Sequence, residues 1–227
     1  MTRYRFAGLV AALVVALALQ STAHIWETLS QGRIGTELDL DRSNGIPDLL
    51  STAVIVAAAL GAVAACIHLR GSLRRRMVAL ACVLTLVAFA DLLHESLDRH
   101  TASGALVALT AVAGFVLLAD LAIADQVGGR VRATVALGLA ALATSIVVGY
   151  LPELNEWFER RRGDAVIEWE TVVKQGLELA GWWLVAVALW DVVGRRRNGR
   201  AARPETTTSP QQRTILAAWL KTSTNGG

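Results

Sequence analysis

Residues 49–69 read LLSTAVIVAAALGAVAACIHL, twenty-one residues without an aspartate, glutamate, lysine or arginine. A helix needs about 20 mostly apolar residues to cross a bilayer, so this stretch has the length and composition of a transmembrane helix. The rest of the chain has the same character, because 54% of its 227 residues are hydrophobic and only 18% are charged. An average soluble domain has about 25% charged residues. The composition indicates a polytopic membrane protein and excludes a disordered chain, a disulfide scaffold and a charged nucleic-acid-binding module.

Five further segments resemble this stretch in length and apolar content. We therefore predict an all-α fold, a bundle of six transmembrane helices within residues 1–194, followed by a basic and polar cytoplasmic tail at 195–227. No proline interrupts a span, which favours continuous helices over the broken helices of many transporters. The expected helices cover about residues 6–27, 47–69, 77–95, 103–125, 131–150 and 168–193.

The charged residues predict how the bundle is oriented. With the N-terminus inside, 15 of the 22 lysines and arginines fall on the inner side, whereas 15 of the 19 acidic residues fall on the outer side. Basic residues are retained on the cytoplasmic side of membranes. Both distributions favour a multi-pass protein of the cell membrane with both termini in the cytoplasm.

The two ends of the chain each allow two interpretations. The small residues 21–23 end an apolar run that follows two arginines, as in a cleavable signal peptide, and cleavage there would leave His24 as the N-terminus. The apolar run continues beyond His24, which favours an uncleaved first helix. In the tail, we expect a mobile segment at 195–209 and a short amphipathic helix at 210–221 on the inner leaflet, since a capping box precedes it. A frayed tail is the alternative.

Ionisable side chains inside a span are costly and therefore mark candidate sites. At a rise of about 1.5 Å per residue, three groups of such residues fall in one layer, the outer third of the bilayer. Within each group the spacing of three or four residues places the side chains on one helix face. We therefore expect the first, third and sixth helices to line one outward-facing polar pocket. Its candidate residues are His24, Glu27, Asp91, His94, Glu95, Glu170, Lys174 and Glu178.

These residue types favour the binding of a cation. His24, His94, Glu95 and Glu178 form a candidate metal set, and imidazole with carboxylate suits zinc, iron or manganese better than copper(I). The same groups could carry protons, because histidine titrates near neutral pH and burial raises carboxyl pKa values toward it. In a purely structural interpretation, Lys174 bridges the two glutamates of its own helix.

Polar and small residues elsewhere have a simpler interpretation. Asp191 and Arg195 are spaced as an i, i+4 ion pair, and Asp120 could reach an arginine in a cytoplasmic loop. We interpret these pairs as devices of orientation and packing. Small residues at 61–65 and 138–144 permit close helix contacts, within the bundle or in a homo-oligomer.

Three functions remain open at this point. The first is an integral membrane protein that binds or moves a cation at the outward-facing pocket. The second is a metal-dependent membrane enzyme acting on a lipid or lipid-linked substrate, with Glu95 or Glu178 as the base. The third is an accessory or structural subunit of a membrane complex. Transport needs a polar path to the inner side, for which only Asp120, Thr144 and Ser145 are candidates. The lipid bilayer is the expected partner in every case, and nothing indicates nucleic acid.

Three short motifs resemble a group of bacterial six-span membrane proteins that have no assigned activity. They are Asn44-Gly-Ile-Pro47 followed by Ser51, Asp91-Leu-Leu-His94-Glu95, and Glu178-Leu-Ala-Gly181. The resemblance implies a bacterial integral membrane protein and directs attention to the same outer residues. It implies no reaction.

Overall fold

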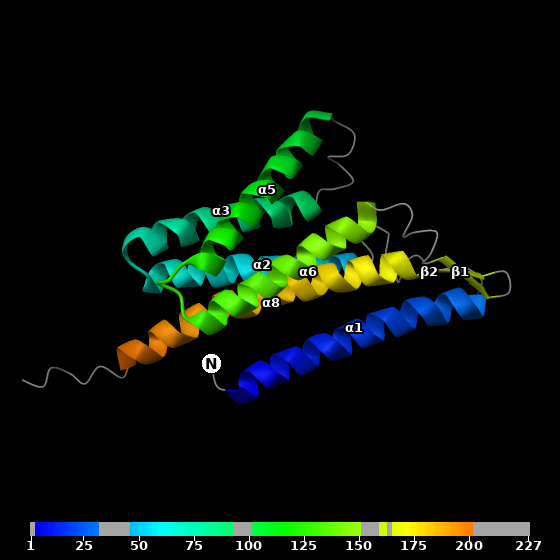
Figure 1. Ribbon diagram of the computed structural model, residues 1–227, viewed down its shortest axis with the longest axis horizontal. Helices are drawn as coiled ribbons and strands as arrows, with labels where there is room; N and C mark the ends of the chain where they lie inside the picture. The colour runs from blue at the N-terminus through cyan, green and yellow to red at the C-terminus, as the bar shows by residue number, and fades with distance from the viewer. Residues whose placement is uncertain (1–2, 32–45, 93–100, 151–158, 163–164, 202–227) are drawn as a thin grey trace, which may run out of the picture.

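The computed structural model describes residues 3–31, 46–92, 101–150, 159–162 and 165–201. These residues form six helices and one two-stranded hairpin (Figure 1). The elements are α1 (Arg3–Gln31), α2 (Ile46–His68), α3 (Gly71–Leu92), α5 (Thr101–Ile123), α6 (Gly129–Tyr150), β1 (Glu159–Arg162), β2 (Ala165–Glu168) and α8 (Trp169–Ala201).

Four of the described helices are long and apolar enough to cross a membrane. The spans lie in α1, α2, α6 and α8, and α5 adds a shorter apolar segment. The predicted helical bundle is therefore confirmed, and four of its helices have the length and apolar character of spans, whereas the count of six spans stays a prediction. The four candidate spans are Ala11–Ser30, Leu49–His68, Gly129–Gly149 and Trp169–Arg195.

The third helix begins earlier than its apolar run predicts. α3 starts at Gly71, six residues before the expected start at 77. Gly71 has a φ of 69°, in the left-handed region that favours glycine, and this residue makes the turn out of α2. Arginines 74–76 are good helix formers, so the helix begins directly after the turn although these residues are charged.

The last helix runs further than predicted. α8 continues to Ala201, whereas the sequence predicted an end near 193 and a mobile segment from 195. The expectation of a mobile segment is therefore wrong for residues 195–201. Arginine has a high helix propensity, and such a helix can extend past the apolar region into water. The expected amphipathic helix at 210–221 lies outside the described residues.

A short β-hairpin is an exception to the predicted all-α fold. β1 and β2 are antiparallel, with Glu159 opposite Glu168 and Arg161 opposite Val166. Valine and isoleucine in β2 favour an extended backbone, which helical periodicity in the flanking sequence does not reveal. α8 begins directly after β2, and β2 packs against α1. The hairpin thus lies against α1 at the end of the bundle at which α8 begins.

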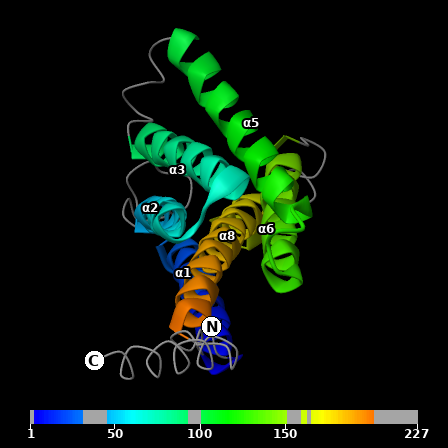
Figure 2. The same ribbon diagram turned by 90° about the vertical axis from the view of Figure 1, so that its left-hand side faces the viewer.

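Helix α8 is the central element of the bundle (Figures 1 and 2). It packs closely against α6 on one side and α2 on another, and α1 lies along it with a smaller contact. α3 packs against α2 and α5, and α5 also contacts α6. The sequence predicted contact among the first, third and sixth helices. The structure has the contact of α1 with α8 but inserts α2 beside α8 instead of α3.

Glycines permit close helix approaches at two crossings with α8. A Cβ atom built on Gly181 would lie 2.9 Å from the carbonyl oxygen of Gly138, where α8 crosses α6. A Cβ atom on Gly61 would lie 3.1 Å from the Cβ atom of Leu189, where α2 meets α8. Small residues let membrane helices approach until their backbones touch. The predicted small-residue segments therefore serve packing inside the bundle.

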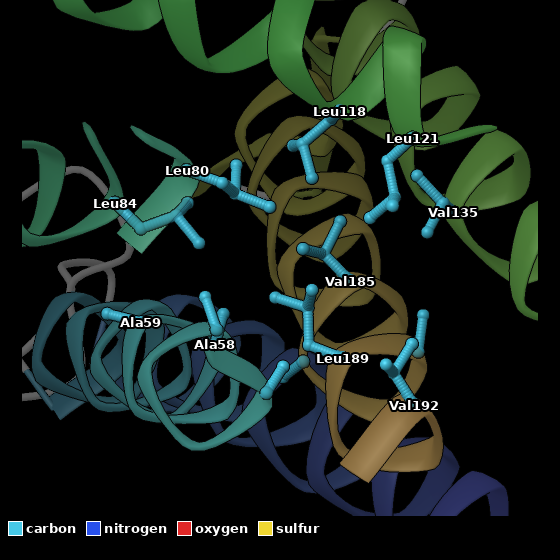
Figure 3. Packing of buried hydrophobic residues seen from close by; sticks show 14 of the residues in the cluster. Ala58, Ala59, Leu80, Leu84, Leu118, Leu121, Val135, Val185, Leu189 and Val192 are labelled. Atoms are coloured by element: carbon cyan, nitrogen blue, oxygen red, sulfur yellow. The ribbon is translucent and has the colours of Figure 1, made fainter. Parts of the chain in front are cut away.

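The apolar core lies among α2, α3, α5, α6 and α8. Its completely or almost completely buried side chains come from every one of these helices (Figure 3). The cluster runs along the bundle from Val54 and Leu179 near one end to Leu73 and Val127 near the other. Its labelled members include Leu80, Leu84, Leu118, Val135, Val185 and Leu189.

Candidate functional site

The buried polar residues gather at one end of the bundle. We name the end where α8 begins the outer end and the end with the α2–α3 turn the inner end, following the predicted orientation. Within the described part of the chain, six of the eight buried polar residues lie toward the outer end. They are His24, Thr28, Ser51, Thr52, Ser145 and Thr171, and the two toward the inner end are Thr134 and Asp191.

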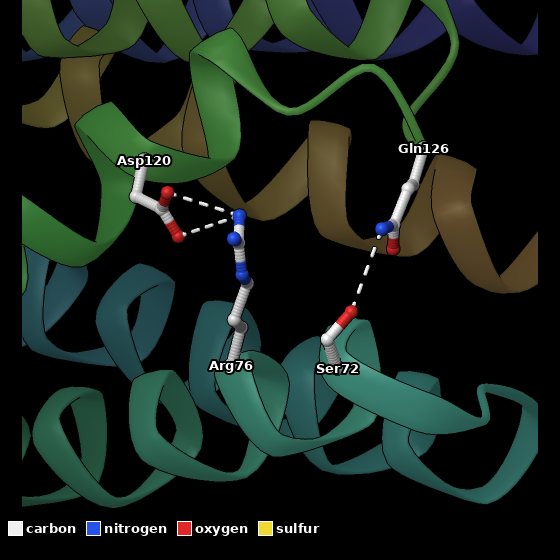
Figure 4. Close-up of polar contacts among 4 residues, drawn as sticks. All are labelled: Ser72, Arg76, Asp120 and Gln126. Carbon is white, nitrogen blue, oxygen red and sulfur yellow. Dashed lines mark hydrogen bonds and ion pairs between the residues drawn. The ribbon is translucent and has the colours of Figure 1, made fainter.

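The inner end carries ion pairs at its surface. Arg76 of α3 reaches Asp120 of α5 with a nitrogen–oxygen distance of 2.9 Å (Figure 4). The prediction that Asp120 meets an arginine is confirmed, and the partner comes from the first turns of α3. Beside this pair, Gln126 donates to the Ser72 hydroxyl at 3.4 Å. Because Arg76 and Asp120 remain about 40% exposed, their pair contributes less than about 1 kcal/mol.

The second predicted inner pair is present as well. The guanidinium Nε atom of Arg195 lies 3.0 Å from a carboxylate oxygen of Asp191, one turn away on α8. Asp191 is buried, whereas Arg195 reaches the surface over Gly128 in the turn between α5 and α6. A Cβ atom on Gly128 would lie only 2.9 Å from Arg195, so this glycine makes room for the arginine. Orientation and packing explain both inner pairs.

Three charged residues of α8 form one stripe near the outer end. Glu170, Lys174 and Glu178 are spaced i, i+4 and i+8, and all three side chains are half-buried. No ion pair joins Lys174 to either glutamate. Instead, the alkyl chain of Lys174 lies along Gly149 of α6, and Ser145 of α6 donates to the Lys174 carbonyl oxygen at 3.0 Å. The stripe therefore faces toward α6.

The predicted residues of α1 form a separate stripe. His24 is completely buried, although α1 has the least buried span of the four candidates. Thr28, one turn further, is also buried and donates to the His24 carbonyl oxygen at 2.9 Å. Gln20, one turn before, has a buried side-chain oxygen without a hydrogen-bond partner in the described residues. The stripe Gln20–His24–Thr28 is thus the face by which α1 joins α8 and β2.

The two stripes lie on different sides of α8. A Cβ atom on Gly176 would lie 3.9 Å from Leu17, so Gly176 faces α1. Glu178 follows Gly176 by two residues, a little over half a turn, and so lies on the far side of α8 from α1. His24 lies seven residues further toward the outer end than Leu17, whereas Glu178 lies two residues further toward the inner end than Gly176. At about 1.5 Å per residue, His24 and Glu178 are therefore about 13 Å apart along the bundle axis. The structure therefore does not bring His24 and Glu178 into one layer.

Other residues share the level of Glu178. α2 runs parallel to α8 and meets it at Gly61 and Leu189, so Ser51, ten residues before Gly61, lies near the level of residue 179. Ser51 is buried, and its hydroxyl has no hydrogen-bond partner within the described ranges. α3 runs antiparallel to α2, and Asp91 follows the α2–α3 turn by as many residues as residue 49 precedes it. Asp91 therefore lies near the level of Ser51. Glu178, Ser51 and Asp91 thus occupy one layer near the outer end.

Several predicted site residues cannot be placed in full. His94 and Glu95 lie outside the described residues. Glu27 lies in α1 and Asp91 in the last turn of α3, but the side chains of both are outside the description. Within the part of the chain that is described, no three His, Cys, Asp or Glu side chains are arranged to hold a metal ion. Sequence reasoning missed Gln20, because a single amide in an apolar run carries no motif, and it named Ser51 only as part of a short motif, without a role at the site.

Comparisons with known protein families, with curated proteins and with solved structures give no match for this chain.

Proposed function

We propose that this protein is a six-span membrane protein, with both termini in the cytoplasm, that binds a cation at an outward-facing pocket between α2, α3, α6 and α8. Glu178 is its central carboxylate, with Asp91 in the last turn of α3, and His94 and Glu95, which follow Asp91 in the sequence, as further ligands. The observation that carries the proposal is the layer of Glu178 and Ser51. A half-buried carboxylate about two and a half turns inside a membrane-length helix lies at the level of a buried hydroxyl that has no hydrogen-bond partner among the described residues.

The surroundings of this layer favour binding over transport. Of the three residues that could continue a polar path inward, Thr144 is exposed on the outside of α6 and donates to the Ala140 carbonyl oxygen. Asp120 is paired with Arg76 at the inner surface. Ser145 bonds the backbone of α8 at the outer end. Below this level the apolar core separates the pocket from the inner side. The pocket is thus open to the outer side only, and the bound cation is a proton or a divalent metal ion.

The metal content of the purified protein distinguishes these two cations. If the ion is a metal, protein prepared without chelators or a metal-binding tag carries about one equivalent of zinc, iron or manganese, as a single-ion site requires. Glu178→Gln loses this metal because a neutral amide replaces the central carboxylate. Glu170→Gln is the matched control, two turns outward on the same stripe, and keeps it. Metal that persists in Glu178→Gln contradicts the assignment of the site. Protein without metal, even after reloading, leaves a proton as the bound cation.

A further inference from the structure

The inner end carries more arginines than its acidic residues neutralise. Within the described ranges, the acidic residues at this end are Asp120, Asp125 and Asp191, and each pairs with one arginine at 2.9–3.0 Å. Three arginines of the α2–α3 turn have exposed side chains and no ion pair in the described part of the chain. They are Arg70, Arg74 and Arg75.

Exposed apolar side chains continue from these arginines along both helices. On α3, Val78 and Cys82 follow Arg74 at four-residue spacing and are exposed. On α2, Val63 and Ile67 precede the turn and are 47% and 72% exposed. Residues three or four apart share one helix face. Each helix therefore presents an apolar strip that ends in an arginine.

The two strips border one another. α2 and α3 pack closely against each other, and the charge of Arg74 on α3 reaches the Cys66 thiol on α2. Cys66 is part-buried beside Ile67, and its thiol donates to the Ala62 carbonyl oxygen at 3.1 Å. The strips of α2 and α3 thus form one continuous apolar surface below a cluster of unneutralised guanidinium groups.

We propose that the α2–α3 turn binds an anionic phospholipid, with its phosphate on Arg70, Arg74 and Arg75 and its acyl chains along the two strips. Guanidinium groups recognise phosphate by charge-assisted hydrogen bonds, and basic sites between membrane helices hold acidic headgroups. Charge complementarity identifies the occupant, because an anionic head with an apolar tail matches both parts of this surface. The site is at the opposite end of the bundle from the cation pocket, so the two proposals stand or fall separately.

Lipid binding by substituted proteins tests this site. The full-length protein in detergent is titrated with phosphatidylglycerol and with phosphatidylcholine of the same acyl chains, and bound lipids are counted by native mass spectrometry. We expect the wild type to prefer phosphatidylglycerol. Arg74→Gln is expected to weaken that binding about fivefold, and the double variant R74Q/R75Q about 25-fold, since each arginine acts on the same phosphate.

Arg132→Gln is the matched control. It removes one positive charge from the same end, but Arg132 is paired with Asp125 rather than exposed without a partner. We expect its affinity for phosphatidylglycerol to stay within about twofold of the wild type, because its charge is already neutralised. Equal binding of both lipids by the wild type would overturn the proposal and leave these arginines as markers of orientation. An equal loss in Arg132→Gln and Arg74→Gln would also overturn it, since net charge alone would then explain the binding.

Discussion

Gly181→Ala is expected to lower the free energy of unfolding by about 2 kcal/mol, although it adds a single methyl group. The built Cβ atom lies 2.6 Å from Leu142 Cγ and 2.9 Å from the Gly138 carbonyl oxygen. Leu142 can change its side-chain conformation, but the Gly138 carbonyl is backbone and moves only if α6 and α8 separate. Because these two helices share the most intimate contact of the bundle, their separation weakens the whole fold. Unfolding in increasing fractions of sodium dodecyl sulfate measures this loss.

Gly176→Ala provides the control on the same helix. Its Cβ atom would meet only Leu17, at 3.9 Å, which is ordinary van der Waals contact. Alanine is a better helix former than glycine, so this variant is expected to keep or gain up to about 1 kcal/mol. Equal losses in both variants would mean that the two glycines matter for a reason other than the α6–α8 crossing.

His24→Ala is expected to loosen α1 from the bundle and to cost about 3 kcal/mol. The side chain of His24 is completely buried, so its removal leaves a cavity. α1 touches α8 and β2 over a small area, and the loss of one buried anchor affects much of that contact. Distances between spin labels on α1 and α8 are expected to broaden in this variant.

Trp26→Ala tests whether the effect belongs to the packed face of α1. Trp26 lies two residues beyond His24 on the same helix and is 71% exposed, so it points away from α8. Its removal is expected to leave the spin-label distances unchanged. A rigid α1 in His24→Ala would show that the helix is held by other contacts and that His24 is not its anchor.

The sequence predicted helix positions well because a membrane helix is marked by its own apolar run. An apolar run of the required length gives the span, and the bounds of α2 and α6 agree with prediction to within one or two residues. The errors in helix bounds arose at charged residues that are helical in the structure. Arginines 74–76 and 195–197 were placed outside the predicted helices because of their charge, but α3 and α8 include them because arginine favours helix. The hairpin before α8 was missed because four-residue strands leave too short a pattern.

The arrangement of the candidate site could be predicted only in part. Depth along a helix follows from residue spacing, and this spacing assigns Glu178 and Asp91 to the same level. Helix neighbours do not follow from spacing, and α2 rather than α3 lies against α8. The prediction that His24 shares a pocket with Glu178 failed for the same reason. α1 packs on the side of α8 away from Glu178, and His24 lies further toward the outer end. These relations depend on Gly138, Gly176 and Gly181, whose partners lie far away in the sequence.

The central claim is that Glu178 binds a cation from the outer side, and modification by an apolar carbodiimide tests it most directly. This reagent attacks carboxyl groups that are protonated in an apolar environment, and mass spectrometry of peptides locates the adduct. We expect Glu178 to be modified in the cation-free protein and to be protected by the cation that binds, with Glu170 unmodified throughout. Modification of both glutamates alike, or of neither at any pH, would contradict the account and leave Glu178 as a structural residue.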